Sequence, residues 1–386
     1  MTHDSERPAD GVTRRKFLLT SGAIGAAGLA GCTGGDNTDT PESSDGGSNS
    51  NGDGSSDSTP TPTPEQTATD SGMANSGPLE AGGSSTVYPI ANTGASYWNA
   101  NRPPSDTEYW PHGEYDIDTK ENLADYWGSL YGFEAGDGGD APFTVTVALS
   151  HSGTGVEKVM NGQHDIGNSS GNVEDELPDR DSYENFVDHV VGVDGQPIVV
   201  SSEIADAGVT KITGQQLKDL YKGKITNWSE LGGPDKEIQV LGRVKGSGTR
   251  TAFVSNVYGN PKENTQVANR YGQNQRLAQA VKQADNAISY LALAFLDTDG
   301  VTPISLEWEG TTYSYQDDQN GLDSKEYPLS RDLHMYTWKD TSMKEAAFIN
   351  MILHDFGQDT FVAPNDYFTL GKRRQKAQMD KLPDQV

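Results

Sequence analysis

Short β-rich runs alternate with amphipathic stretches along the chain from about residue 79 to the C-terminus. Runs of β-branched and aromatic residues predict strands, because these side chains suit a pleated, half-buried surface. Their alternation with helical patterns is typical of α/β layers built around open sheets. The predicted strands are 143–149, 189–193, 197–202, 238–243 and 333–338, and the predicted helices are 155–162, 213–223, 249–259, 274–283 and 342–357.

The stretch 213–223 carries the clearest helical signal. Leu217, Leu220 and Tyr221 recur on one face of a helix. Thr213 stands where a cap would begin that helix, and Gly223 stands where a left-handed residue would end it. The two ends of this helix are therefore predicted from side-chain chemistry as well as from periodicity.

The first 32 residues are predicted to be a twin-arginine lipoprotein signal. Arg14 and Arg15 precede an apolar run of small residues that is too short and too rich in glycine for a membrane span. The run ends at Cys32, the single cysteine, in a context that resembles a lipobox. Lipid attachment at Cys32 would anchor the protein at the extracytoplasmic face of the membrane, as would an uncleaved anchor helix. One cysteine excludes disulfides within the chain.

Residues 33–78 are predicted to form a disordered stalk. They consist mainly of Gly, Ser, Asp, Thr and Pro, with a TPTPTP run at 59–64. Such a segment buries too little apolar surface to offset the entropy lost on ordering. A stalk of this kind would let a tethered domain stand away from the lipid.

The charge of the chain excludes some functions. With 56 acidic and 29 basic residues the net charge is −27, as on the hydrated surface of a protein from a salt-loving organism. This balance, without a basic face, disfavours nucleic acid as a partner.

The sequence lacks the motifs of common hydrolases and nucleotide-binding enzymes. There is no G-x-S-x-G elbow and no Walker loop, and the seven histidines form no H-E-x-x-H pair. We therefore expect no catalytic residues, no metal and no cofactor.

Four junctions between predicted strands and helices are rich in Gly, Ser and Thr. Small residues leave main-chain N–H groups accessible where a helix begins, and the helix dipole adds partial positive charge there. One junction also carries the cations Arg243, Lys245 and Arg250, and arginine is a planar donor suited to oxyanions. Convergence of all four would surround a tetrahedral anion. The junctions are 82–91, 150–159, 167–175 and 242–253.

At these junctions the sequence resembles the PstS-like substrate-binding proteins of phosphate ABC transporters, within the type 2 periplasmic-binding fold. The segments GSSTVYPI, ITGQQLKDLYKGKITNW, VLGRVKGSGTRTAF and YPLSRDLHMYT follow the order of that family. The resemblance implies an α/β fold of two lobes with two crossover hinge strands. It places lobe I at 79–196 plus 333–386 and lobe II at 197–332.

The resemblance also implies the partners and the ligands. Inorganic phosphate would bind between the lobes, and a monomer would deliver it to ABC permease subunits. Arg243 matches the arginine that grips the anion, and Thr86 matches a hydroxyl ligand of the first turn. Arg250 could reach the anion or pair with an acid on the lobe surface. The implied phosphate-binding residues are Ser85, Thr86, Val87, Ser152, Ser170, Arg243, Ser247, Gly248, Thr249 and Arg250.

Three features depart from the family pattern. Ser170 stands where many members have an aspartate that accepts the proton of phosphate, so selectivity against sulfate is less secure. Lys245 replaces an acidic residue that holds the arginine in part of the family, so Arg243 needs another orienting partner. The spacer 92–142 is long and aromatic, and it either caps lobe I or faces a partner.

Three other functions compete with phosphate capture. The same fold could bind sulfate, molybdate or tungstate, and Ser170 favours this alternative. An extracellular phosphoester hydrolase would need a nucleophile and a base that the motifs do not supply. A structural or adhesive surface lipoprotein would suit the stalk but would not need four donor-rich turns.

Overall fold

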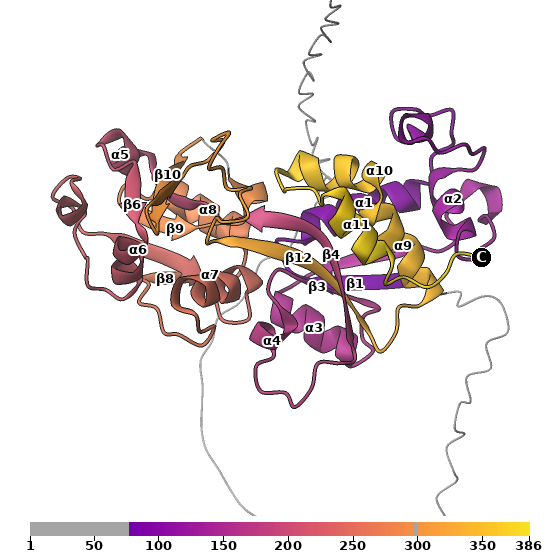
Figure 1. Ribbon diagram of the computed structural model, residues 1–386, viewed down its shortest axis with the longest axis horizontal. Helices are drawn as coiled ribbons and strands as arrows, with labels where there is room; N and C mark the ends of the chain where they lie inside the picture. The colour runs from indigo at the N-terminus through magenta and orange to yellow at the C-terminus, as the bar shows by residue number, and fades with distance from the viewer. Residues whose placement is uncertain (1–76, 297–298) are drawn as a thin grey trace, which may run out of the picture. The chain divides into compact units, whose positions relative to one another are not determined.

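A computed structural model describes residues 77–296 and 299–386 of the chain (Figure 1). The predicted signal, Cys32 and almost all of the predicted stalk lie outside the described residues. Within the described part, two β-sheets form, one of five strands and one of seven. Helices pack against both sheets, so the predicted α/β class is confirmed.

The first sheet has the order β2-β1-β3-β12-β4. β1 is parallel to β2 and β3, whereas β12 is antiparallel to both β3 and β4. β12 therefore brings a late part of the chain into the middle of a sheet that is otherwise built from early strands. The strands are β1 (Leu79–Gly83), β2 (Val145–Leu149), β3 (Ile166–Ser169), β4 (Phe186–Gly195) and β12 (Ser330–Trp338).

Helices from both ends of the described chain cover this sheet. Figure 1 shows α1, α9 and α11 on one side of the sheet and α3 with α4 on the other. The elements around it are α1 (Tyr88–Ala100), η1 (His112–Tyr115), α2 (Leu123–Ser129), η2 (Asp137–Gly139), α3 (Ser152–Met160), α4 (Val173–Glu176), α9 (Met343–Leu353), α10 (Asp355–Gly357), η5 (Gln358–Val362), η6 (Ala363–Asn365) and α11 (Lys372–Met379).

The second sheet has the order β11-β10-β5-β9-β7-β8, and β6 pairs with β10 beside this path. Its strands are β5 (Ile198–Ser201), β6 (Lys211–Thr213), β7 (Gln239–Arg243), β8 (Asn269–Tyr271), β9 (Ala287–Tyr290), β10 (Val301–Trp308) and β11 (Thr311–Tyr313). Its helices are α5 (Ser202–Asp206), α6 (Gly214–Tyr221), η3 (Trp228–Leu231), α7 (Gly248–Tyr258), α8 (Asn274–Gln283) and η4 (Leu293–Phe295).

The chain crosses between the two sheets twice. β4 of the first sheet is followed at once by β5 of the second, and residues 314–329 lead from β11 back to β12. β4 and β12 pair along their whole length and run side by side between the sheets (Figure 1). This agrees with the expected two-lobed fold with two crossover strands. We propose the lobe boundaries expected from the sequence, and we call the parts around the first and second sheets lobe I and lobe II.

The predicted helix 213–223 is confirmed as α6, and its ends follow the predicted chemistry. The Thr213 hydroxyl accepts a hydrogen bond from the Gln216 N–H at 3.1 Å, and the Gln216 side chain accepts from the Thr213 N–H at 2.8 Å. This reciprocal capping box satisfies two donors that the first turn leaves without partners. Gly223 has φ +67°, the left-handed conformation that ends a helix cheaply in glycine.

The prediction of one helix over 342–357 is wrong at its C-terminal end. α9 stops at Leu353, because His354 adopts an extended conformation with φ −64° and ψ 158°. The His354 ring nitrogen Nδ1 then accepts a hydrogen bond from the Phe356 N–H at 3.2 Å and caps the short helix α10. A histidine that acts as a cap does not show in an apolar periodicity.

The long aromatic spacer packs into lobe I. Trp110 and Trp127 are almost completely buried, and the ring of Trp110 meets that of Phe356 at 5.2 Å between centroids. The ring of Tyr97 meets that of Phe361 at 5.2 Å, close to a right angle. Edge-to-face contacts of this kind add about 0.5 to 1.5 kcal/mol each to the free energy of burial. Of the two alternatives for the spacer, the structure shows a cap on lobe I.

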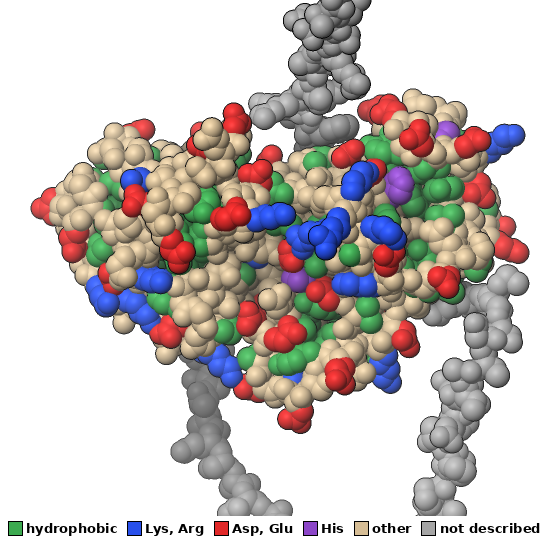
Figure 2. Space-filling view, in the orientation of Figure 1, with side chains coloured by type: hydrophobic (Ala, Val, Ile, Leu, Met, Phe, Trp, Pro, Cys, Tyr) green, Lys and Arg blue, Asp and Glu red, His purple; other side chains and the backbone are tan. Residues whose placement is uncertain are grey.

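Charged side chains are spread unevenly over the surface. Figure 2 shows acidic groups scattered over the visible face and basic groups gathered around α11. Several of these basic groups are paired, as Arg374 is with Asp332 at 2.7 Å and Lys376 is with Asp380 at 2.7 Å. None of the helices in the described ranges has the length and apolar character of a membrane span.

Candidate functional site

The turn between β1 and α1 buries three hydroxyl side chains in succession. Ser84, Ser85 and Thr86 are each 3 % exposed or less. The Thr86 N–H donates to the Ser84 hydroxyl at 3.1 Å, which fixes the turn from within. Gly83 has φ +136°, and a Cβ there would stand 2.2 Å from the Asn168 carbonyl oxygen. A glycine is thus required for the turn to lie so close to β3.

The turn between β7 and α7 supplies a second group of buried polar residues. Ser247 stands at the cap position of α7, yet its side chain makes no capping hydrogen bond. Its hydroxyl is buried and has no hydrogen-bond partner among the described residues. Arg243 and Thr249 flank it, and each is 1 % exposed. Burial of so many donors in one short turn is costly unless they have partners.

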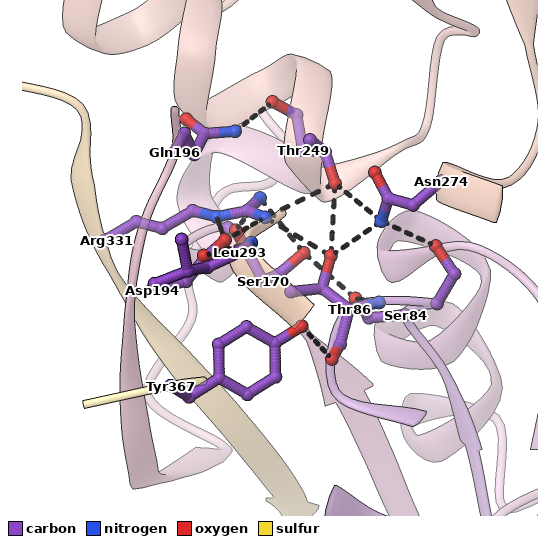
Figure 3. A network of polar contacts seen from close by, with 12 residues as sticks. Ser84, Thr86, Ser170, Asp194, Gln196, Thr249, Asn274, Leu293, Arg331 and Tyr367 are labelled. Atoms are coloured by element: carbon purple, nitrogen blue, oxygen red, sulfur yellow. Dashed lines mark hydrogen bonds and ion pairs between the residues drawn. The ribbon is translucent and has the colours of Figure 1, made fainter. Parts of the chain in front are cut away.

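These two turns meet between the lobes. The Thr86 and Thr249 hydroxyl oxygens lie 3.1 Å apart (Figure 3 draws this contact). Arg243 Nη1 donates to the Thr249 hydroxyl at 3.0 Å, and Arg243 Nη2 donates to the Ser85 hydroxyl at 3.2 Å. Residues from lobe I and lobe II therefore share one hydrogen-bond network.

Arg243 is oriented by main-chain oxygens rather than by a carboxylate. Its Nε donates to the Tyr271 carbonyl at 3.1 Å, and its Nη2 donates to the Gly272 carbonyl at 2.7 Å. Across the described ranges no acidic group forms an ion pair with it. Burial, with a smaller contribution from the nearby Arg331, lowers the pKa of Arg243 to about 10, against an opposing effect of Tyr290. The sequence has Lys245 where part of the family has an acidic residue that orients the arginine. The two carbonyl groups orient Arg243 in its place.

Ser152 and Ser170 form the adjoining wall of the network. Their hydroxyl oxygens lie 3.4 Å apart, and the Ser170 N–H donates to the Ser152 hydroxyl at 3.1 Å. The Ser84 hydroxyl donates to that of Ser170 at 2.9 Å. A Cβ on Gly248 would stand 2.2 Å from the Ser152 hydroxyl oxygen and 2.6 Å from that of Ser170. Gly248 therefore allows α7 of lobe II to approach these serines of lobe I.

A second arginine, which the sequence analysis did not select, enters the network from β12. Arg331 Nη2 donates to the hydroxyls of Thr86 at 3.2 Å and Thr249 at 3.3 Å. Its Nη1 donates to the Ser170 hydroxyl at 3.2 Å. Behind it, Asp194 on β4 accepts from Nη2 at 2.6 Å and from Nε at 2.9 Å. Burial raises the pKa of Asp194, and the charge of Arg331 opposes that effect.

Asn274, at the start of α8, was also missed. Its amide nitrogen donates to the hydroxyls of Ser85 and Thr86 at 3.2 Å each, and it lies 3.5 Å from that of Thr249. Arg331 stands beside Asp332 at the start of an apolar strand, within the segment YPLSRDLHMYT, and Asn274 stands at a helix start; neither local pattern singles the residue out as a ligand. We call the converging residues the donor cluster: Ser84, Ser85, Thr86, Ser152, Ser170, Arg243, Ser247, Thr249, Asn274 and Arg331.

Two predicted ligands do not share these side-chain contacts. Arg250 is turned away, and its Nη2 donates to the Glu263 carbonyl at 3.1 Å. Its hydrogen-bond partner is thus a main-chain oxygen, and the charge of Glu176 also acts on its guanidinium. Val87 is fully buried where α1 begins and contributes an apolar side chain to the core. Gly248, also predicted as a ligand, has no side chain, and its role in the site is to let α7 approach Ser152 and Ser170.

The donor cluster is rich in hydrogen-bond donors and carries more positive than negative charge. Two guanidinium groups, an amide and seven hydroxyls converge, while Asp194 is the one carboxylate paired with either arginine in the part of the chain that the structure describes. Such a buried set of donors with surplus positive charge suits a ligand with several acceptor oxygens and negative charge. In the same ranges, no group of three or more His, Cys, Asp or Glu residues could hold a metal ion.

Comparison with known proteins agrees with this geometry. The family model described as a PBP superfamily domain matches residues 137–355, more than half of the chain. The phosphate-binding protein PstS of Bacillus subtilis is 29 % identical over 223 residues, which are 58 % of this chain and 70 % of that protein. PstS of Staphylococcus saprophyticus is 25 % identical over 254 residues, which are 62 % of this chain and 76 % of that protein.

Two solved structures share the fold. One, from Clostridium perfringens, is assigned as a phosphate ABC transporter substrate-binding protein and contains bound phosphate. It has a TM-score of 0.55 at 23 % identity and covers 76 % of this chain and 99 % of its own. A phosphate transport receptor from Vibrio cholerae has a TM-score of 0.52 at 22 % identity. The match covers 76 % of this chain and 100 % of the receptor chain. At these identities the likeness concerns the fold alone.

Proposed function

The chain belongs to the PBP superfamily, and we propose that it captures inorganic phosphate in the donor cluster between its two lobes. The observation that carries this proposal is the convergence of Arg243 and Arg331 on the Thr249 hydroxyl, with a carboxylate, Asp194, paired to Arg331 only. The two arginines and Asp194 leave a net positive charge in a buried site. A doubly charged tetrahedral anion offers both the charge and the acceptor oxygens that this site lacks.

The number of available donors is sufficient for useful affinity. A hydrogen bond to a charged group contributes about 1.5 to 3 kcal/mol net. Micromolar binding needs about 8 kcal/mol. Arg243, Arg331 and a few hydroxyls meet that requirement after the cost of ordering the ligand. Because the donors are already held by one another and by main-chain oxygens, little further ordering is needed.

We propose that the residues expected from the sequence divide the work. Ser85, Thr86, Ser152 and Ser170 would contact the anion from lobe I, with the Val87 N–H as a further donor. Arg243, Ser247, Gly248 and Thr249 would contact it from lobe II. Arg331 and Asn274 are additions from the structure. Arg250 is left out of the set that we expect to touch the anion, because its guanidinium donates to the Glu263 carbonyl.

The same proposal covers the place of the protein in uptake. Contacts of one anion with both lobes would hold them together, and a membrane permease could recognise that closed shape. We propose that the protein acts as a monomer at the extracytoplasmic face, anchored through a lipid on Cys32, and passes phosphate to ABC permease subunits. It would bind its ligand without changing it chemically.

A second candidate keeps the fold and changes the anion. Ser170, where an aspartate would discriminate by accepting the proton of phosphate, receives hydrogen bonds from Ser84 and Arg331. Its hydroxyl oxygen therefore acts as an acceptor from protein groups, and its own proton can go to the Ser152 hydroxyl at 3.4 Å or to an anion oxygen. Sulfate, molybdate or tungstate would suit such a donor as well as phosphate does.

Titration calorimetry in molar KCl tests these alternatives. Phosphate should bind with a dissociation constant in the micromolar range or below, and sulfate more weakly, on the order of tenfold or more. Preference for sulfate or molybdate would support the second candidate. Absence of binding by every tetrahedral anion would refute both. Incubation with a chromogenic phosphate ester should release no product, and turnover would favour a hydrolase.

A further inference from the structure

A carboxyl group without a partner lies directly behind the donor cluster. Glu176 ends α4, the short helix that follows the Ser170 turn. Its side chain is partly buried, and both carboxylate oxygens are shielded from solvent. Neither oxygen has a hydrogen-bond partner within the described residues. A buried ionised carboxylate without partners is very costly, so this group needs an explanation.

Glu176 lies beside turns that carry three donors of the cluster, Ser152, Ser170 and Ser247. A Cβ on Gly171, which follows Ser170, would stand 2.5 Å from Glu176 Oε1 and 3.6 Å from the Cα of Gly248. A Cβ on Gly153, which follows Ser152, would stand 3.4 Å from Oε2 and 3.7 Å from the Cα of Gly246. The carboxyl group therefore lies where two turns of lobe I meet the Arg243–Arg250 turn of lobe II.

Burial governs the charge state of Glu176. Desolvation is the largest effect, and the pKa of Glu176 is raised to about 8; the charge of Asp175 adds to the rise, while the charges of Arg331 and Arg250 and the nearby Thr251 hydroxyl, which donates to the Ser247 carbonyl at 3.2 Å, oppose it. The Tyr336 phenol also lies close enough for the charge of Glu176 to raise its pKa. Near neutral pH Glu176 therefore keeps its proton, and the positive charge left by Arg243, Arg331 and Asp194 is not cancelled.

We propose that Glu176 sets the charge that the donor cluster presents to its anion. While the carboxyl group holds its proton, the cluster keeps one surplus positive charge and binds a doubly charged anion. When the proton leaves, the new negative charge cancels that surplus and weakens binding. Glu176 is a positioning residue in this scheme, since it acts through the field and touches no ligand atom. The proposal rests on the proposed function.

Linkage makes the effect measurable without any mutation. A group whose ionisation weakens anion binding must take up protons when the anion binds. The proton that a dianion draws to Glu176 comes from the buffer. The binding enthalpy of phosphate near pH 8.5, measured in buffers of different ionisation enthalpy, should therefore show net proton uptake by the full chain.

A pair of variants assigns the uptake to this residue. Glu176→Gln keeps the shape and removes the charge, and Glu174→Gln removes the same charge from an exposed position on the same helix. Between pH 7 and 9 the ratio of Glu176→Gln to wild-type phosphate affinity should rise several-fold, and the Glu174→Gln ratio should stay constant. Because all three proteins receive the same ligand, the titration of phosphate itself cancels in these ratios.

The outcomes separate the two proposals. If wild type and Glu176→Gln bind phosphate with the same pH profile, or if wild type takes up no protons, the role of Glu176 is refuted while phosphate capture stands. If neither protein binds phosphate but both unfold cooperatively, phosphate capture itself fails. A Glu176→Gln protein that binds no phosphate while wild type does would also refute the charge-setting role, because the neutral variant should bind at least as well.

Discussion

The hydroxyl oxygens of Thr86 and Thr249 lie 3.1 Å apart, although the two residues are 163 positions apart in the sequence. Thr86 lies in the turn just before α1 of lobe I, and Thr249 lies in the first turn of α7 of lobe II. This contact is central to the proposed mechanism, because an anion that binds both hydroxyls also binds both lobes. The predictions below test the groups around it.

Replacement of Arg243 should remove the strongest donor of lobe II. Arg243→Ala should weaken phosphate binding about tenfold or more, since one charge-assisted hydrogen bond is worth about 1.5 to 3 kcal/mol. Calorimetry in molar KCl measures the change. Lys245→Ala is the matched control, because it removes the same charge from an exposed position in the same turn. Equal losses in both variants would mean that the turn attracts anions only through its general charge.

Removal of Arg331 should reduce stability as well as affinity. Arg331→Gln leaves Asp194 buried without its cation, which should cost about 3 to 5 kcal/mol of the free energy of unfolding. Addition of Asp194→Asn removes the unpaired charge and should restore most of that stability, while phosphate binding stays weak. Denaturant unfolding and calorimetry on the single and double variants separate the two effects. Recovery of affinity in the double variant would exclude Arg331 as a ligand.

A methyl group at position 248 should keep the lobes from meeting. In Gly248→Ala the new Cβ would overlap the Ser152 hydroxyl, so α7 must withdraw from lobe I. Phosphate affinity should fall at least tenfold, with little change in the stability of either lobe. Gly113→Ala serves as control, because nothing lies within 4 Å of a Cβ there. Unchanged affinity in Gly248→Ala would show that binding does not need this approach.

The buried His189 should make the protein sensitive to acid. Burial and the charge of Lys381 lower the pKa of His189 to about 4, against an opposing effect of Asp188. The unfolded chain, with a pKa near 6.5, therefore binds the proton more readily than the native state does. Stability should fall as the pH drops from about 6.5 to 4, at up to about 1.4 kcal/mol per pH unit from this group.

His189→Gln should reduce that slope, because glutamine can still bond the Thr341 hydroxyl, which lies 2.8 Å from His189 Nε2, without titrating. Thermal unfolding of both proteins between pH 4 and 7 measures the difference. Parallel curves for the two proteins would show that other groups cause the loss of stability in acid.

The sequence predicts local structure well where a residue acts only on its close neighbours along the chain, as a helix cap does. Thr213 and Gly223 mark the ends of α6 because a capping hydroxyl and a left-handed glycine depend only on their neighbours. The end of α9 could not be predicted, since His354 acts as a cap through its ring nitrogen. An apolar periodicity that continues through such a residue gives no sign of the break.

The candidate site was predictable in part for a similar reason. Turns rich in Gly, Ser and Thr mark helix starts, and the resemblance to PstS-like proteins singled out Thr86, Ser152 and Thr249 within these turns. The pairing of Arg331 with Asp194 joins two strands 137 positions apart in sequence and depends on the register of β12 against β4. No local pattern encodes that register, so the second arginine emerged only from the structure.

The place of β12 between β3 and β4 has a consequence for biosynthesis. A nascent chain that ends before β12 can pair β1 with β2 and β3, but it cannot attach β4 to them, because the strand that bridges β3 to β4 has yet to be made. The ribosome must therefore release almost the whole polypeptide before this half of the molecule matures, whereas the half encoded in the middle is free to fold earlier.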